Sequence, residues 1–169
     1  MENSQIDLRE LSVPSAMDLT LIPLDVALLL RDWGVTQGRG LVIQRQTRWF
    51  PLCFQSLAHA KDVLSQRSVH IFIAHWHVDS GHTFDNHVTQ FVKYLKSKRM
   101  GPGIGSGPLL VGGWLTGGDD DENLVRFLNQ TYDCSMEYLE TGPERFVPWI
   151  AEQLWALLPS KPRHPIWLE

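Results

Sequence analysis

The stretch VHIFIA, residues 69–74, decides the fold of this chain. It places β-branched and aromatic residues side by side without polar alternation, which is typical of a strand buried on both faces. Such strands belong to parallel sheets that helices cover on both sides. The stretch therefore predicts an α/β protein built on a parallel sheet.

Short apolar runs and amphipathic helical stretches alternate on both sides of this strand. Parallel strands need crossover connections, and right-handed crossovers place helices on the two faces of the sheet. The pattern predicts a flavodoxin-like three-layer sandwich with a five-stranded parallel sheet. The expected strands are 18–22, 40–44, 69–74, 108–113 and 135–139, and the expected helices are 24–34, 56–66, 84–98, 119–130 and 143–158.

The ends of the chain differ in composition from the middle. Residues 1–17 lack periodicity, and residues 159–169 contain three prolines. We expect an N-terminal tail, an α/β domain over residues 18–158, and a Pro-rich C-terminal tail. A length of 169 residues with 43% hydrophobic residues suits one domain with its own core.

Charge and composition exclude several classes of protein. The net charge of −4 and the absence of a lysine or arginine block argue against direct binding of nucleic acid. No apolar run reaches the roughly 18 residues of a membrane helix, and the polar N-terminus is no signal peptide. Two cysteines without framework spacing favour reduced thiols, so we expect a cytoplasmic protein.

Three histidines and an aspartate follow the buried strand within eight positions: His75, His77, Asp79 and His82. The spacing resembles the HxHxDH signature of metallo-β-lactamase-like hydrolases, which implies zinc. Ser80 replaces the last histidine of that signature, and no histidine occurs between His87 and His164. Zinc needs three or four ligands, so a metal-dependent hydrolase is the alternative hypothesis rather than the preferred one.

Taken over residues 18–158, the chain resembles a response-regulator receiver domain. The resemblance rests on AHWHVDSGHTFDNHVTQFVKYL for the third strand, loop and third helix, and on PLLVGGWLTGGDDDENLVRFL for the fourth strand and helix. MEYLETGPERFVPWIAEQL resembles the fifth strand, its turn and the last helix. The order of elements agrees with the family, whereas the motif residues differ.

The resemblance implies where the family's phosphorylation residues would lie. A receiver needs an aspartate nucleophile, an acidic pair that holds Mg²⁺, and a lysine. His75 stands at the nucleophile position, Asp25 alone stands for the acidic pair, and the lysine position falls near Glu140 or Thr141. The predicted degenerate pocket comprises Asp25, His75, Gly113, Thr116 and Thr141.

These substitutions favour a pseudo-receiver that is no enzyme and needs no cofactor. We expect a phosphorylation-independent signalling or regulatory module that contacts a protein partner or forms a homodimer. Receivers usually bind partners through the fourth helix, fifth strand and last helix, and aromatic residues are favoured in interface cores. The residues expected on this surface are Leu124, Phe127, Tyr138, Phe146, Trp149 and Trp155.

A tetrapyrrole-binding sensor is a further alternative. The stretch LLVGGW, residues 109–114, resembles the Gly-Gly strand end of cobalamin-binding domains and their haem-binding relatives. The cobalt-ligating DxHxxG loop of that family does not follow the first expected strand. His75 or His77 would have to supply the ligand instead.

Overall fold

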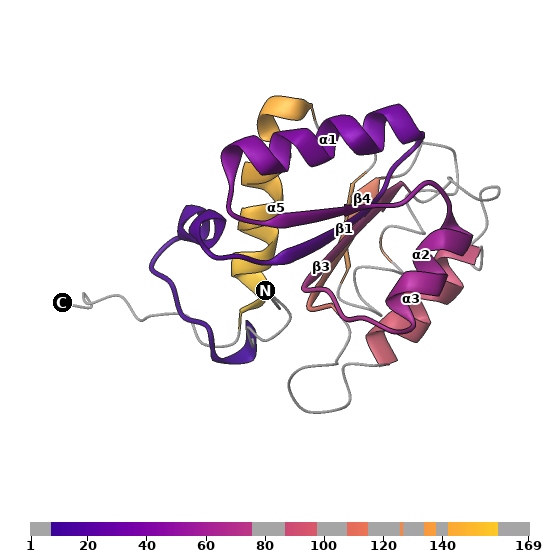
Figure 1. The fold of residues 1–169 in the computed structure, drawn as a ribbon. Coiled ribbons are helices and arrows are strands. Elements are labelled where there is room, and N and C mark those ends of the chain that lie inside the picture. The colour runs from indigo at the N-terminus through magenta and orange to yellow at the C-terminus, as the bar shows by residue number, and fades with distance from the viewer. Residues whose placement is uncertain are drawn as a thin grey trace.

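The computed structural model describes residues 8–75, 87–97, 108–114, 126, 134–137 and 142–158. Five parallel strands form one sheet in the order β2-β1-β3-β4-β5 (Figure 1). This is the flavodoxin-like order, and it confirms an α/β fold with a parallel sheet. The strands are β1 Asp25–Leu29, β2 Phe50–Cys53, β3 Ile71–His75, β4 Leu110–Trp114 and β5 Cys134–Glu137.

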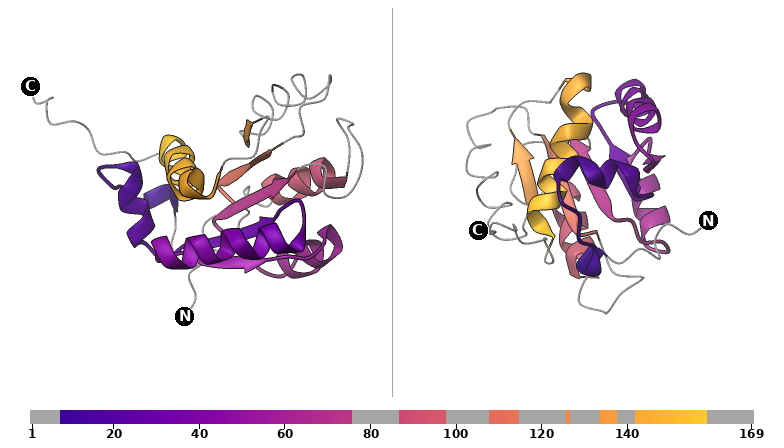
Figure 2. Two further views of the ribbon diagram at one scale, coloured as in Figure 1. Left: turned by 90° about the horizontal axis from the view of Figure 1, so that it is seen from above. Right: turned by 90° about the vertical axis from the view of Figure 1, so that its left-hand side faces the viewer.

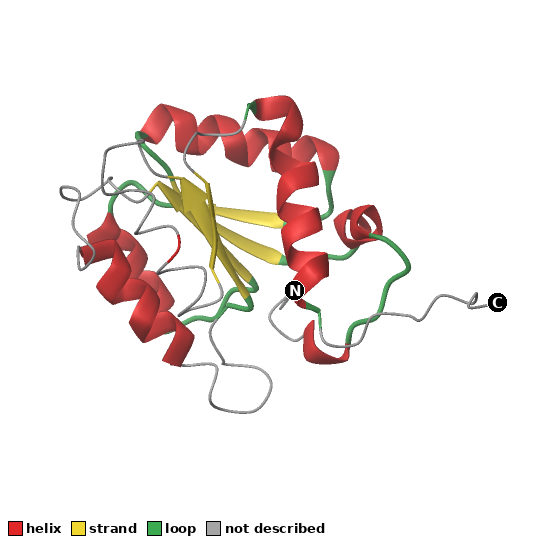
Figure 3. Ribbon diagram, turned by 180° about the vertical axis from the view of Figure 1, so that it is seen from behind, coloured by secondary structure: helices red, strands yellow, loops and turns green. Residues whose placement is uncertain are grey.

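Helices cover both faces of the sheet, as the ribbon seen from behind shows (Figure 3). The apolar residues of α1 and α5 join one core cluster, and those of α2 and α3 join the other. Between the two helices of the first layer, the Arg39 guanidinium lies 5.5 Å from the centre of the Phe146 ring. The described helices are α1 Trp33–Gln46, α2 Leu57–Leu64, α3 His87–Ser97 and α5 Pro143–Leu157.

The central strands β1 and β3 supply residues to both clusters. In β3, Ile71 and Ile73 pack with α1 and α5, whereas Phe72 and Ala74 pack with α2 and α3. All five residues of β3 are buried. The strand predicted over 69–74 is therefore confirmed, and its unbroken apolar run reflects burial on both faces.

The first strand is not the one that the sequence predicted. Residues 18–21 lie in a 3₁₀ helix, η3 Ala16–Leu21, and Ile22 is its C-cap. The strand β1 comes from the stretch predicted to be a helix over 24–34. Leucine and alanine favour helices in isolation, but this run is buried on both sides between β2 and β3. Tertiary burial outweighs local propensity here.

The strand predicted over 40–44 is also wrong, because these residues lie within α1. The helix contains three glycines, which have low helix propensity. One of them is needed by the packing, since a Cβ on Gly40 would lie 2.8 Å from Cys53 Sγ on β2. The glycine lets the helix approach the edge strand closely.

The remaining expectations agree better with the structure. The helices predicted over 56–66, 84–98 and 143–158 are confirmed as α2, α3 and α5, and the strand predicted over 108–113 is confirmed as β4. Pro148 lies inside α5 near its start. The strand predicted over 135–139 begins one residue earlier, at Cys134. The helix predicted over 119–130 lies outside the described residues, Arg126 excepted.

The boundary predicted at residue 18 needs correction for the described part of the N-terminal segment. Leu8 and Val13 are buried in the core that α1 and α5 share. The Trp155 indole on α5 donates a hydrogen bond to the Val13 carbonyl at 3.1 Å. Figure 2 shows the N-terminal segment (indigo) beside α5 (yellow). Residues 8–21 are thus part of the domain, while the C-terminal tail predicted over 159–169 lies outside the described residues.

Gly113 provides a test of the central packing. A Cβ at Gly113 would overlap the carbonyl oxygen of Ala74 on the neighbouring strand. We expect Gly113→Ala to lower the free energy of unfolding by about 3 kcal/mol in a urea titration, because two backbones must separate. Gly38→Ala is the matched control: nothing lies within 4 Å of its Cβ, and it should raise stability by about 1 kcal/mol. Equal effects would contradict the strand packing.

Burial raises the pKa of the Cys53 thiol above its ordinary value of 9.0. The folded protein then keeps the thiol proton at a pH where the unfolded chain loses it. We expect the stability contributed by this thiol to be complete below pH 9.0 and to fall as the pH rises above it. Urea titrations of the wild type and of Cys53→Ser across this range test the expectation, since the serine variant should lack this loss.

Candidate functional site

The carboxyl ends of the parallel strands meet at one edge of the sheet, where ligands bind in open α/β sheets. His75 ends β3 and is the register partner of Trp114, the last residue of β4. Trp114 in turn pairs with Glu137, the last described residue of β5. His75 therefore lies in the middle of the carboxyl edge, at the level of the neighbouring strand ends.

His75 is buried, with 6% of its surface exposed. Residues alternate between the two faces along a strand, and Ile71 and Ile73 point toward α1 and α5. His75 follows the same parity and belongs to that face. The receiver resemblance expects an acidic side chain at this point.

The end of β1 carries a different chemistry from the acidic pair of receivers. The strand is followed by buried Leu30 and then by exposed Arg31 and Asp32. The Asp32 carboxylate caps α1 by accepting a hydrogen bond from the Val35 amide at 2.9 Å. Thr36 closes the turn: its hydroxyl accepts from the Leu30 amide at 3.0 Å and donates to the Asp32 carbonyl.

Asp32 is the acid at this edge that the sequence analysis missed. Because the first strand was predicted over 18–22, the acidic pair was assigned to Asp25, which lies at the other end of the real strand. An aspartate that follows an apolar run and precedes a helix is a standard N-cap signal, and it could have located the strand end correctly.

Asp25 belongs to the opposite edge, so its assignment to the degenerate pocket is wrong. It is the first residue of β1, about 13 Å along the strand from Leu29. Its buried carboxylate pairs with Arg67 at 3.3 Å, and its backbone amide donates to His70 Nδ1 at 2.9 Å. These contacts join β1 to the residues just before β3 at the amino edge.

Gly113 is the one other predicted pocket residue among those described. It lies one position before the end of β4 and pairs with Ala74. Since this position has no room for a side chain, it cannot supply a switch hydroxyl. Other predicted residues of the pocket and of the metal loop lie outside the described residues: Thr116, Thr141, His77, Asp79 and His82.

The predicted partner surface is corrected for α5. Phe146 is fully buried and Trp149 is 8% exposed, so both are core residues. Trp155 is half-buried and its indole is bonded to Val13. The apolar side of α5 faces the sheet and the N-terminal segment, which leaves these aromatic rings little free surface. Leu124, Phe127 and Tyr138 lie outside the described residues.

Within the described part of the chain, no three histidine, cysteine, aspartate or glutamate side chains gather closely enough to hold a metal ion. The same residues include no helix that is long and apolar enough to cross a membrane. The zinc alternative depends on His75, His77, Asp79 and His82, and the tetrapyrrole alternative on His75 or His77. Since residues 76–86 lie outside the described part of the chain, both stay predictions.

The role of Asp32 as a helix cap can be tested directly. We expect Asp32→Ala to lower the free energy of unfolding by about 1 kcal/mol, because the Val35 amide loses its acceptor. Asp32→Ser keeps a capping oxygen and should remain within a few tenths of a kcal/mol of the wild type. Urea titration measures both, and equal losses in the two variants would contradict the capping role.

The comparisons with known proteins agree with this topology. No model of a known protein family matches the chain, and no curated protein matches it in sequence. One similar solved structure is HP1043, an orphan response regulator of H. pylori, with a TM-score of 0.56 and 14% identity over 78% of this chain and 96% of the other. Another is a BeF₃-activated DrrB receiver domain, with a TM-score of 0.53 and 14% identity over 78% and 97% of the two chains. The chain thus has the fold of receiver domains.

Proposed function

We propose that this chain is a regulatory module that uses the receiver fold without phosphorylation and acts through protein–protein contacts. One observation carries the proposal: the carboxyl edge of the sheet presents buried His75 at the end of β3, where the receiver resemblance expects an acidic phosphoacceptor. The neighbouring strand β1 ends at Leu29 and is followed by Leu30 and Arg31 instead of an acidic pair.

The chemistry of the edge supports phosphorylation independence. Mg²⁺ requires hard oxygen ligands in octahedral array, usually including one or two carboxylates. At the end of β1 the nearest carboxylate is that of Asp32, which is engaged as the cap of α1. Arg31 adds a positive charge next to it. An imidazole, a leucine and an arginine suit neither the metal nor acyl-phosphate formation.

Without this switch chemistry, the sheet and its helices act as a rigid scaffold that presents surface to other proteins. The module works with a protein partner or a second copy of itself in the cytoplasm. The fold supports this assignment, since the two similar structures belong to a response regulator and a receiver domain. Regulation would then come from partner binding rather than from phosphoryl transfer.

Beryllofluoride gives the sharpest test, because BeF₃⁻ binds an aspartate beside Mg²⁺ as an acyl-phosphate mimic. We expect ¹⁹F NMR of the protein with Mg²⁺, beryllium and fluoride to give free fluoroberyllates alone and no protein-bound resonance. The same mixture with a phosphorylatable receiver domain is the positive control. Tryptophan fluorescence recorded in parallel should not change.

A bound fluorine resonance that needs Mg²⁺ would overturn phosphorylation independence. The metal alternative has its own measurement: elemental analysis of untagged protein, wild type and the His75→Ala, His77→Ala double variant. If the wild type contains stoichiometric zinc and the double variant does not, the scaffold proposal is wrong and the loop is a metal site. A Soret band lost in the same variant would assign a tetrapyrrole.

A further inference from the structure

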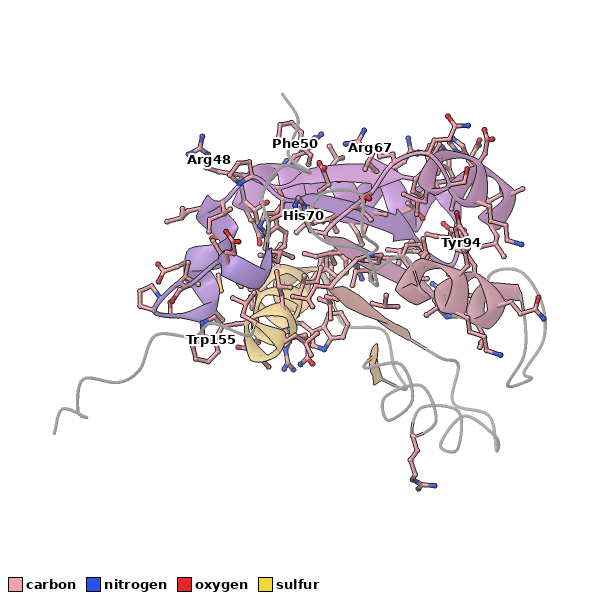
Figure 4. All side chains as sticks on the ribbon, turned by 90° about the horizontal axis from the view of Figure 1, so that it is seen from below. Arg48, Phe50, Arg67, His70, Tyr94 and Trp155 are labelled. Carbon is pink, nitrogen blue, oxygen red and sulfur yellow. The ribbon has the colours of Figure 1, made fainter. Side chains whose placement is uncertain are left out.

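Exposed apolar side chains and arginines gather at the amino edge of the sheet, opposite the edge that carries His75. Phe50, the first residue of β2, is 51% exposed. Leu21 at the end of η3 is 63% exposed. Arg48 and Arg67 flank Phe50 on the same side of the molecule (Figure 4). We call these four residues the amino-edge patch.

Contacts with Asp25 and Thr20 bring these residues together from three segments of the chain. Asp25 is the register partner of Phe50 on the neighbouring strand, and its carboxylate holds the Arg67 guanidinium at 3.3 Å. Phe50 and Arg67 therefore both lie next to Asp25 at the amino edge. The Arg48 amide donates to the Thr20 carbonyl at 2.8 Å, which places Leu21 beside Arg48.

The backbone beneath the patch is held firmly. Trp49, between Arg48 and Phe50, points inward with 3% exposure and donates its indole hydrogen to the Leu19 carbonyl at 2.8 Å. The Phe50 amide donates to the Leu24 carbonyl at 2.7 Å. The Asp25 amide donates a hydrogen bond to His70 Nδ1. Because the backbone of the patch is already ordered, the patch would lose little conformational entropy when a partner binds.

The charge of the patch is opposite in sign to the net charge of the whole chain. The chain carries a net charge of −4, whereas the exposed charged side chains of the patch are both arginines. Asp25 is buried beneath the patch and offsets part of the Arg67 charge. Arg67 remains 44% exposed, and a guanidinium has five donors in a fork that matches carboxylates. Arg48 and Arg67 therefore form an anion-attracting pair around an apolar centre.

The edge strand itself sets the mode of recognition. Pro51 in β2 has no amide hydrogen, which weakens the edge as a template for an added strand. A partner would therefore be recognised through side chains rather than by strand addition. An exposed aromatic anchor surrounded by arginines is the composition favoured in binding hot spots.

We infer that the amino-edge patch binds an acidic segment of a partner protein, with an apolar side chain of the partner seated against Phe50 and Leu21. The partner's carboxylates pair with Arg48 and Arg67. This rests on the proposed function, since it names the surface and the partner chemistry of a module that acts through protein contacts. The two arginines are too few for the continuous basic track that single-stranded nucleic acid requires.

The test uses the whole protein and a short fluorescein-labelled peptide in which glutamates flank a Leu-Trp pair. We expect saturable binding by fluorescence anisotropy that weakens as salt rises. Phe50→Ala and Arg48→Glu should each weaken binding by about tenfold. The matched controls are Leu41→Ala, exposed on α1, and Arg31→Glu, exposed at the carboxyl edge, and both should bind as the wild type does.

Arg67 is not substituted, because its removal would take away the positive charge that pairs with the buried Asp25 carboxylate and would destabilise the fold. Urea titration must show that each variant is folded. The inference is overturned if the peptide does not bind, or if Phe50→Ala and Arg48→Glu bind it as tightly as the wild type does. Tighter binding of a single-stranded oligonucleotide would overturn it as well. Self-association that Phe50→Ala abolishes would assign the patch to a second copy instead. The beryllofluoride test does not depend on these results. Binding by the patch can therefore be disproved while phosphorylation independence is retained.

Discussion

Burial of β1 and β3 on both faces is the constraint on which the structure depends. Each strand sends alternate side chains into two separate cores, one with α1 and α5 and one with α2 and α3. A shift of one residue in either strand would exchange the two sets and misplace every contact. The register brings His75 to the carboxyl edge and Asp25 to the amino edge. The chemistry of each edge is thus fixed by apolar packing in the middle of the sheet.

Local patterns predicted the elements whose environment matches their own propensity. The run 69–74, the amphipathic α2 and the apolar stripe of α5 were identified from the sequence because composition and burial agree there. The pattern failed over residues 18–46, where a leucine-rich run forms a strand and a glycine-rich stretch forms a helix. Burial between two strands decides the first, and close contact with Cys53 decides the second. Neither neighbour is visible in a short window of sequence.

The candidate site shows the same limit. His75 was found from the sequence because it directly follows the strongest strand signal. Asp25 was assigned to the wrong edge since its position depends on where β1 begins, and its partners lie more than forty residues away. The aromatic residues of α5 were expected on a surface because the last helix belongs to the usual partner face in the receiver resemblance. The covering segment is residues 8–21, and the sequence predicted its residues 8–17 to be a tail and residues 18–21 to be part of a strand.

The bond between Trp155 and Val13 joins positions 142 residues apart. A ribosome synthesises the segment around Val13 first and α5 much later, so this part of the core cannot close until the last described helix has emerged. This part of the core is therefore complete only after α5 has been synthesised, which makes folding of this domain a late and cooperative event.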